Sequence, residues 1–360
     1  MTVTLDQALV QAVAAGLTGA DLQPMAVTEA TLNQAVSHRV QGLLARALDL
    51  GVVTADAQTA VAVRDIHVAA LRTCLIAEET AVLAADALAT AGIGFRILKG
   101  VAIAHLDHDP SDRVFGDADV LIARRDHGSA LDALQRAGFV RDEPPVRGWW
   151  ERRYGKAIIV RAPHGGELDL HVALTGGYFG HLLTTAELID RPGDSLALAG
   201  RQVMALDPAD RLLHACCHAV LGGGSGLRAL RDIAQLVLVS DADWQLTVAR
   251  AERVQAGAVV ALAVQRTWAI LQLPPDHAAA VWANNAHVSA LQQQMLDSYE
   301  VAFGSNWMPE GRSLLRALGP VDRALCAIGL AFPSRASLRA RHRTLWQHLR
   351  RGSATIGTSS

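Results

Sequence analysis

The chain has 360 residues, of which 51% are hydrophobic and 19% are charged, and its formal net charge is −2. This composition is typical of a globular protein long enough for two or three domains. It excludes the strongly basic field that non-specific nucleic-acid binding requires, although a local basic patch can still serve an RNA acceptor.

The cysteines and the N-terminus indicate the compartment. Four cysteines are scattered through the chain without CxxC spacing, which is typical of a protein from a reducing compartment. The N-terminal stretch "MTVTLDQALVQAVAAG" has no basic segment before an apolar one, so it does not resemble a signal peptide. No uninterrupted apolar run reaches the roughly 18 residues of a membrane span. We therefore expect a cytoplasmic protein without a membrane partner.

Residues 1–92 are rich in Ala, Leu and Val with helical periodicity, which predicts an N-terminal helical region. The stretch 66–92, "IHVAALRTCLIAEETAVLAADALATAG", predicts one long helix. Gly92 and Gly94 follow its last periodic residues and are typical of a helix C-terminus.

Residues 93–206 alternate between short strand-like and helix-like segments, which predicts a small mixed sheet. "RGWWERRYGKAIIVRAP" is interpreted as two strands with a turn at "YGK". "SLALAGRQVMAL" is interpreted as a hairpin around Ala199–Gly200. The other expected strands are "FRILKG", "DADVLIA", "FVRDEP" and "GGELDLHVAL", and the expected helices are "VAIAHLDH" and "RDHGSALDALQRAG".

Residues 207–351 are again helical, starting at Asp207 as N-cap with Pro208 in the first turn. Residues 352–360 form an expected flexible tail. The sequence therefore predicts an α+β fold, in which a small mixed sheet core at 93–206 is flanked by helical regions at 1–92 and 207–351.

Carboxylates gather on two of the predicted strands. Asp117 and Asp119 are two residues apart in "GDADVLI", and Glu167, Asp169 and His171 share the same spacing in "ELDLHV". Because side chains two apart in a strand point to one face, each set is expected to converge. Three carboxylates around one point suit Mg²⁺, and paired ions catalyse in-line phosphoryl displacement. An isolated DxD more often only caps a strand, and either Glu167 or Asp169 can supply the third carboxylate.

A lysine and a glycine mark the turn from the first strand into its helix. Gly100 allows a close backbone approach, and the N–H groups of a helix N-terminus can bind phosphate. Lys99 adds a positive charge there, and the only other lysine in the chain is Lys156.

These stretches together resemble an uncharacterised nucleotidyltransferase-like family of the polymerase-β-type nucleotidyltransferase superfamily. The resemblance covers residues 60–345, and its catalytic motifs lie within 97–172. One departure from the wider superfamily is Gly100-Val101, where Gly-Gly or Gly-Ser is usual. The matching motifs are Leu98-Lys99-Gly100, Arg113, Gly116-Asp117-x-Asp119 and Asp169-Leu170-His171.

The resemblance implies transfer of a nucleoside monophosphate from an NTP, such as ATP, to an acceptor, with release of pyrophosphate. Asp117 and Asp119 would hold two Mg²⁺ or Mn²⁺ ions, and Asp169, as the family's third carboxylate, would help hold one. Lys99 or Arg113 would neutralise phosphate charge at Gly100 and Gly116. His171 is interpreted as either a structural hydrogen-bonding residue or a substrate contact.

The sequence leaves two questions open. The acceptor can be a small molecule, a peptide or protein side chain, or an RNA 3′ end. A non-catalytic nucleotide-binding or scaffold protein on the same fold is the alternative function.

Three further motifs favour structural interpretations. "HACCH" at 214–218 is interpreted as core packing rather than a zinc site, while His218 and Asp232 either border the active site or join two helices. "LGGGSG" at 221–226 is interpreted as a turn between helices, because it lacks the P-loop ending. The basic stretch 335–351 is interpreted as an exposed helix or as a contact for RNA or acidic partners.

Overall fold

The computed structural model describes residues 4–17, 24–144, 146–221, 226–240, 242–300 and 318–339. Three predicted features fall outside these ranges in whole or in part: most of the glycine-rich turn, most of the basic stretch, and the tail. Within the described ranges, no helix has the length and apolar character needed to cross a membrane.

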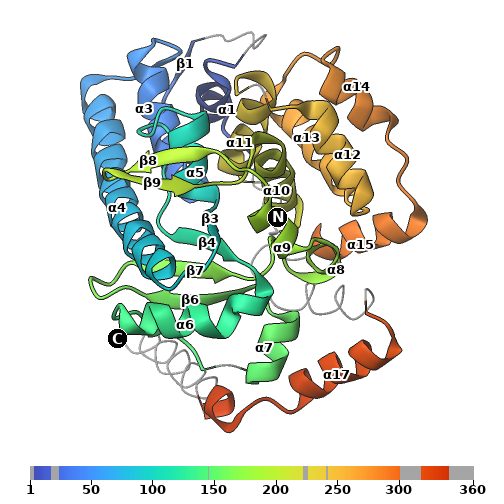
Figure 1. Cartoon of the computed structure of the whole chain (residues 1–360). Coiled ribbons are helices and arrows are strands. Elements are labelled where there is room, and N and C mark those ends of the chain that lie inside the picture. Colours follow the sequence, from blue (N-terminus) through green and yellow to red (C-terminus); the bar gives the residue numbers. More distant parts are fainter. Residues whose placement is uncertain are drawn as a thin grey trace, which may run out of the picture.

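A five-stranded sheet lies at the centre of the molecule (Figure 1). Its strand order is β3-β4-β7-β6-β5, with β4 parallel to β7 and every other neighbouring pair antiparallel. The predicted α+β class with a small mixed sheet is therefore confirmed. The strands are β3 (Phe95–Ile97), β4 (Ala118–Ile122), β5 (Val140–Arg141), β6 (Ala157–Arg161) and β7 (Glu167–His171).

The two faces of this sheet have different partners. The helices α4 (Ala57–Thr90) and α6 (His127–Arg136) cover one face, where alternate residues of β4 such as Val120 join their core. The residues of β4 that alternate with these, including Asp119, point their side chains to the opposite face. Because every residue of β4 is buried, the strand is covered on both sides, and its aspartate lies in the interior.

Helices from both ends of the chain pack into one hydrophobic core. Leu44 from the N-terminal part and Cys216 and Val260 from the C-terminal part belong to the same buried cluster. The expected domain boundaries at residues 92 and 206 coincide with changes in secondary structure. The shared core contains residues from the segments on either side, so the division into domains stays a prediction. These helices are α1 (Gln7–Ala14), α2 (Glu29–His38), α3 (Gln41–Asp49), α10 (Pro208–Leu221), α11 (Leu227–Leu238), α12 (Trp244–Arg253), α13 (Gly257–Leu271), α14 (Ala278–Asn285) and α15 (Ala290–Glu300).

The remaining elements are short or peripheral. A two-stranded parallel sheet, which the sequence did not indicate, joins the loops around α2 and α3. α10 begins as predicted, since the Asp207 side chain accepts a hydrogen bond from the Asp210 backbone N–H at 2.9 Å. The elements are β1 (Met25–Ala26), β2 (Val53–Thr54), α5 (Lys99–Asp107), the 3-10 helix η1 (Arg124–Asp126), α8 (Gly177–Leu182), α9 (Thr185–Asp190) and α17 (Pro320–Ala331).

The predicted hairpin after α9 is confirmed. β8 (Ser195–Leu198) and β9 (Arg201–Met204) pair antiparallel around a two-residue turn. Ala199 and Gly200 have φ of 47° and 77°, the two positive values that a type I′ turn requires.

The strand predicted over the tryptophan pair was wrong, because Gly148–Tyr154 forms the helix α7. Helical spacing places Trp150 and Tyr154 on one face, with ring centroids 5.9 Å apart. Both pack with Cys326 of α17, and Trp150 Nε1 donates to the Cys326 carbonyl at 3.1 Å. The aromatic residues suggested a strand, whereas packing against a distant helix stabilises the helical form.

Candidate active site

Two aspartates on adjacent parallel strands form the centre of the site. Asp119 of β4 and Asp169 of β7 are register partners, so their side chains stand next to each other on the face away from α4. Glu167 lies towards the start of β7, where its Oε2 accepts a 2.9 Å ion-pair contact from Arg161. Of the two candidates for the third carboxylate, Asp169 is therefore the one beside Asp119.

Lys99 reaches this pair because β3 borders β4. The Leu98 backbone N–H donates to the Asp119 carbonyl at 2.9 Å, and the chain then turns into α5. Lys99 has a φ of 40°, a left-handed conformation that is strained for a residue with a side chain. Its Nζ donates to Asp119 Oδ1 and lies 3.2 Å from His171 Nε2.

His171 connects the lysine, the aspartate and the backbone. Its Nδ1 lies 3.1 Å from the Ala173 carbonyl oxygen, so this nitrogen carries a proton and donates it. In the neutral ring, Nε2 then presents a lone pair 2.9 Å from Asp119 Oδ1. A lone pair and an anionic oxygen this close require a cation between them, and the Lys99 ammonium supplies it.

Burial and neighbouring charges perturb the pKa of each member. Burial raises the pKa of Asp119, but the charge of Lys99 outweighs it and leaves that pKa well below its usual value. Burial, followed by the charge of Asp119, raises the pKa of Asp169 to about 6. Burial and the Lys99 charge lower the pKa of His171 to about 4, so this ring is neutral at pH 7. One carboxylate is thus held ionised and the other titrates near neutral pH.

The cluster has the donor set of a cation site. Ligand atoms of Asp119, Asp169 and His171 lie within 4.8 Å of one another. Asp169 Oδ1 is buried and has no hydrogen-bond partner among the described residues, which is costly unless a cation or donor binds there. Asp117 precedes β4, is half-buried, and does not belong to this group of converging ligand atoms.

The two motif glycines have different environments. A Cβ on Gly100 would lie 2.7 Å from Phe115 Cβ, so close packing against Phe115 explains this glycine without a ligand. A Cβ on Gly116 would meet no described atom within 4 Å. The backbone before Asp117 therefore faces open space.

Arg113 has a buried partner that the sequence did not assign to it. Its Nε and Nη2 donate to the two carboxylate oxygens of Asp232 on α11, at 2.8 and 2.7 Å. Burial raises the pKa of Asp232, but Arg113 outweighs this and lowers it far below its usual value. Arg113 therefore joins the sheet region to the C-terminal helices, and the edge of its guanidinium used in this pair is unavailable to phosphate.

Two groups from the C-terminal helices border Lys99. His218 and Asp232 line a small cavity together with Lys99. His214 lines the same cavity, and the sequence analysis did not assign it a role. Cys216 and Cys217, from the same motif, are fully buried in the helical core, which confirms their packing role.

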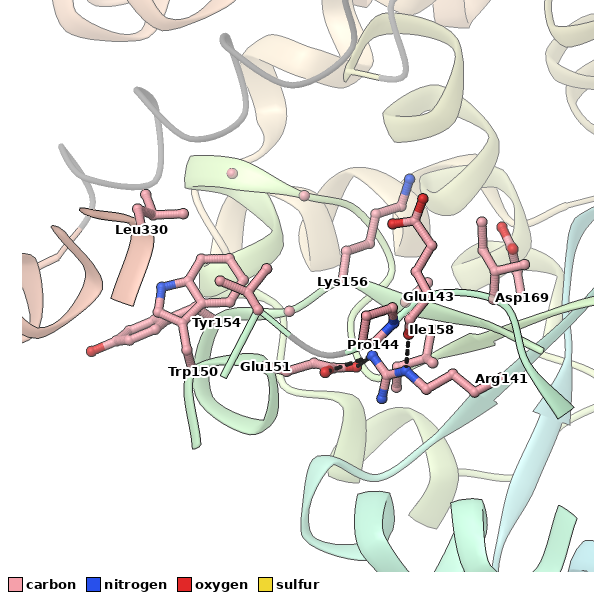
Figure 2. Close-up of a pocket in the computed structure, with 16 residues that line it drawn as sticks. Arg141, Glu143, Pro144, Trp150, Glu151, Tyr154, Lys156, Ile158, Asp169 and Leu330 are labelled. Carbon is pink, nitrogen blue, oxygen red and sulfur yellow. Dashed lines mark hydrogen bonds and ion pairs between the residues drawn. The ribbon is translucent and has the colours of Figure 1, made fainter. Parts of the chain in front are cut away.

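A larger pocket of about 390 Å³ opens beside Asp169 (Figure 2). Trp150, Tyr154 and Leu330 gather at one end of it, and Asp169 lies at the other. Its volume is within the range of small-molecule sites. The helix α7 brings Trp150 to this pocket.

The pocket also carries charged side chains. Arg141 Nη2 donates to both carboxylate oxygens of Glu151, at 2.6 and 2.8 Å. This ion pair lies between the aromatic end of the pocket and Asp169 (Figure 2). Glu143 and Lys156 line the same space, so a ligand there would meet both signs of charge.

One consequence of the carboxylate pair is a stability penalty. Asp169→Asn is expected to stabilise the metal-free protein at pH 8 by about 1–3 kcal/mol, because the wild-type pKa of about 6 exceeds the ordinary value of 3.8. In the wild type, the folded state retains a proton that the unfolded chain has lost between these values, so stability falls as pH rises through this window. Urea denaturation with a chelator at pH 8 and pH 4.5 measures the effect, which should shrink at the lower pH.

Glu167→Gln is the matched control on the same strand. Its exposed ion pair contributes about 0–1 kcal/mol, so its removal should not stabilise the protein. A metal-free Asp169→Asn protein no more stable than wild type at pH 8 would contradict the penalty from burial and charge repulsion at Asp169.

Comparisons with known proteins identify the family of this chain. Residues 26–272, more than half of the chain, match a family described as uncharacterised nucleotidyltransferase. Among solved structures, the antibiotic-resistance factor ANT(2'')-Ia is similar at 16% identity and a TM-score of 0.35, over 51% of this chain and 95% of that chain. An antigenic nucleotidyltransferase-like protein from Paracoccidioides brasiliensis is similar at 18% identity and a TM-score of 0.30, over 52% and 92%. No curated protein matches the chain. The chain therefore belongs to the family of uncharacterised nucleotidyltransferases.

Proposed function

We propose that the protein transfers a nucleoside monophosphate from an NTP to an acceptor, releases pyrophosphate, depends on Mg²⁺ or Mn²⁺, and works in the cytoplasm. The observation that carries this proposal is the adjacent pair of the buried Asp119 and the half-buried Asp169, in which an unbonded carboxylate oxygen lies beside an ionised carboxylate. The family match supports the same reaction class.

The carboxylates would hold the divalent cations. Asp119 and Asp169 would supply converging oxygens, and Asp117 would contribute from the loop just before β4. When bound, Mg²⁺ or Mn²⁺ would neutralise phosphate charge and align the attacking and leaving oxygens. The structure offers a reason for the strained backbone of Lys99, since this conformation holds its ammonium over the same oxygens in the free protein.

The nucleotide would lie along the turn from β3 into α5. Lys99 would neutralise phosphate charge, and the open backbone at Gly116 would admit the nucleotide next to Asp117. His171 would offer its Nε2 lone pair as a further ligand atom beside Asp119, while its Nδ1 stays bonded to the backbone.

The acceptor would bind in the pocket beside Asp169. Its hydroxyl would approach the cation site at Asp169, which lines one end of this pocket. The aromatic end formed by Trp150 and Tyr154 would hold an apolar part of the acceptor. This pocket fits a small molecule or an extended side chain.

The alternative is a nucleotide-binding or scaffold protein without catalysis. A purely structural role gives no reason to place two carboxylates next to each other, because each raises the energy of ionising the other. The raised pKa of Asp169 is the kind of perturbation found at catalytic sites. We therefore favour the catalytic function.

The test is calorimetric titration of ATP, GTP, CTP and UTP with Mg²⁺ into wild type, Asp117→Asn and Asp119→Asn. We expect at least one nucleotide to bind wild type in a metal-dependent way. Loss of a residue that only supports a metal ligand typically weakens binding by about 10–100-fold. Both substitutions remove a proposed ligand, so they should weaken binding by more than this. Asp132→Asn, on the exposed side of α6, is the control for charge alone. Equal nucleotide binding by wild type and the two site variants would refute the metal-dependent function.

A further inference from the structure

The long helix α4 runs along the edge of the molecule and carries a row of exposed apolar side chains (Figure 1). The row repeats about every seven residues, and seven residues are only ~20° from two full turns of an α-helix, so its members share one side of the helix. Each is between 36% and 65% exposed. We call this row the α4 stripe, and it consists of Val61, Val68, Leu75, Ile76 and Leu83.

The core of the protein does not explain the α4 stripe. The opposite side of α4 already packs against the sheet through buried residues such as Ala77, Ala81 and Leu88. Single exposed apolar side chains are common on protein surfaces, whereas several gathered on one side of a helix indicate an interaction site. The α4 stripe therefore indicates a partner.

Two charged side chains within the stripe identify the kind of partner. Arg72 lies three residues before Leu75, and Glu79 lies three residues after Ile76. Both charged residues are exposed, and neither pairs with another residue in the described part of the chain. The stripe is therefore apolar at its centre, with a positive charge on one side of this centre and a negative charge at the same spacing on the other side.

A second copy of α4 fits this pattern when it runs antiparallel about a two-fold axis between Leu75 and Ile76. Arg72 of each copy would then face Glu79 of the other copy, and Leu75 would face Ile76, so every contact would occur twice. In a parallel pair each residue would face its own counterpart, which places Arg72 against Arg72 and Glu79 against Glu79. Because like charges in contact are unfavourable, the charges select the antiparallel arrangement.

The flanking residues agree with this arrangement. Val68 would face Leu83, which extends the apolar contact on both sides of the axis. Asp65 would face Asp86, but Arg201 Nε donates to Asp86 Oδ1 at 2.7 Å, so these two carboxylates are not an uncompensated pair of like charges. With 34 residues, α4 is about 51 Å long, so the stripe can form an extended seam.

We propose that two copies of the chain form an antiparallel dimer through the α4 stripe. The dimer leaves the candidate active site uncovered, because Asp119 lies on the face of the sheet away from α4. α4 also supports the loop that leads to the site, since Thr73 Oγ1 and Cys74 Sγ donate to the Phe115 carbonyl at 3.2 and 3.3 Å. The dimer therefore holds the helix behind this loop in place. The inference does not depend on the proposed function.

Analytical ultracentrifugation of the full chain at micromolar concentrations measures the dimer. We expect wild type to sediment as a dimer. Leu75→Glu places a charge at the centre of the seam twice by symmetry, so it should raise the dissociation constant by about 100-fold or more. Val281→Glu, at a 47% exposed valine of α14, is the matched control and should leave the dimer intact.

A charge exchange tests the contact between Arg72 and Glu79. Arg72→Glu or Glu79→Arg alone places like charges opposite each other at two points, so each should weaken the dimer by about tenfold or more. The double variant Arg72→Glu/Glu79→Arg restores opposite charges and should recover most of the affinity. Both positions are exposed, so these variants test the interface even where Leu75→Glu does not fold.

Cross-linking through single added cysteines tests the direction of the helices. The four native cysteines are buried, so a short bis-maleimide should react with the added cysteine. Leu75→Cys should link the two copies, because this residue lies next to the two-fold axis. Val61→Cys should not link them, because its two thiols would lie about 44 Å apart along the antiparallel helices.

The possible results separate the dimer from other arrangements. A monomeric wild type would overturn the proposal and leave the α4 stripe to a different partner. A wild-type dimer that Leu75→Glu and both single charge variants leave intact would also overturn it, because the copies would then meet elsewhere. Cross-linking through Val61→Cys would overturn the antiparallel direction, and a double charge variant that recovers no affinity would overturn the contact between Arg72 and Glu79.

Discussion

Asp232→Ala is expected to destabilise the protein by about 3–5 kcal/mol, the cost of leaving one partner of a buried ion pair uncompensated. Arg113 and Asp232 are 5% and 3% exposed, and two hydrogen bonds of 2.7–2.8 Å join them. Removal of the carboxylate leaves the guanidinium charge in the interior between the sheet region and α11. Urea denaturation at pH 7.5 measures the free energy of unfolding.

An exposed pair of the same geometry is the control. Arg161 donates to both oxygens of Asp142 at 2.8 Å, but their side chains are 46% and 31% exposed, so Asp142→Ala should cost only about 0–1 kcal/mol. The double variant Arg113→Met/Asp232→Leu should recover much of the loss, because it removes both charges. Similar effects of Asp232→Ala and Asp142→Ala would show that the buried pair does not stabilise the fold as described.

Lys99→Met is expected to tighten Mn²⁺ binding by the nucleotide-free protein by about tenfold or more. The Lys99 ammonium contacts Asp119 Oδ1 and His171 Nε2, two of the three converging ligand atoms, so it opposes a second cation there. A tenfold change is about 1.4 kcal/mol. Two unit charges about 4 Å apart interact with an energy of about 4 kcal/mol at an effective dielectric constant of about 20. The expected change is a modest part of this repulsion between Lys99 and the cation. Calorimetric titration of Mn²⁺ without nucleotide measures it.

The chain offers one matched control for this substitution, since Lys156 is the only other lysine. Lys156→Met removes the same charge from the pocket wall without vacating Asp119, so its effect on Mn²⁺ affinity should be smaller. In that variant Lys99 is the sole lysine, and its acylation, followed by mass spectrometry, should increase when Mn²⁺ displaces the ammonium. Unchanged Mn²⁺ affinity in Lys99→Met would mean that the lysine does not compete with the cation.

The sequence predicted best the features that depend on local periodicity. The spacing of Asp119 within its strand and of Asp169 within "ELDLH" determined which face each side chain takes, and the register then brought them together. The turn at Ala199–Gly200 was also predictable, because its residues lie next to each other in the chain. These features need no knowledge of how distant helices pack.

Features that depend on distant segments were not predictable in the same way. Arg113 and Asp232 are 119 residues apart, and only the docking of α11 onto the loop before β4 makes them partners. His214 lies beside Lys99 because α10 packs against α5. Its local sequence motif does not contain this information and suggested only a zinc site or core packing. The helix α7 was missed because its tryptophans favour strands locally, and the contact with α17 lies 176 residues away.

Transfer of label from an α-labelled NTP tests the central claim most directly. Wild type and Asp119→Asn would be incubated with Mg²⁺, each labelled NTP and cell extract, and labelled products would be separated and identified by mass. The account predicts an acceptor that gains one nucleoside monophosphate in the presence of wild type and not in the presence of Asp119→Asn, with pyrophosphate as the second product. Equal labelling of that acceptor by both proteins would contradict it.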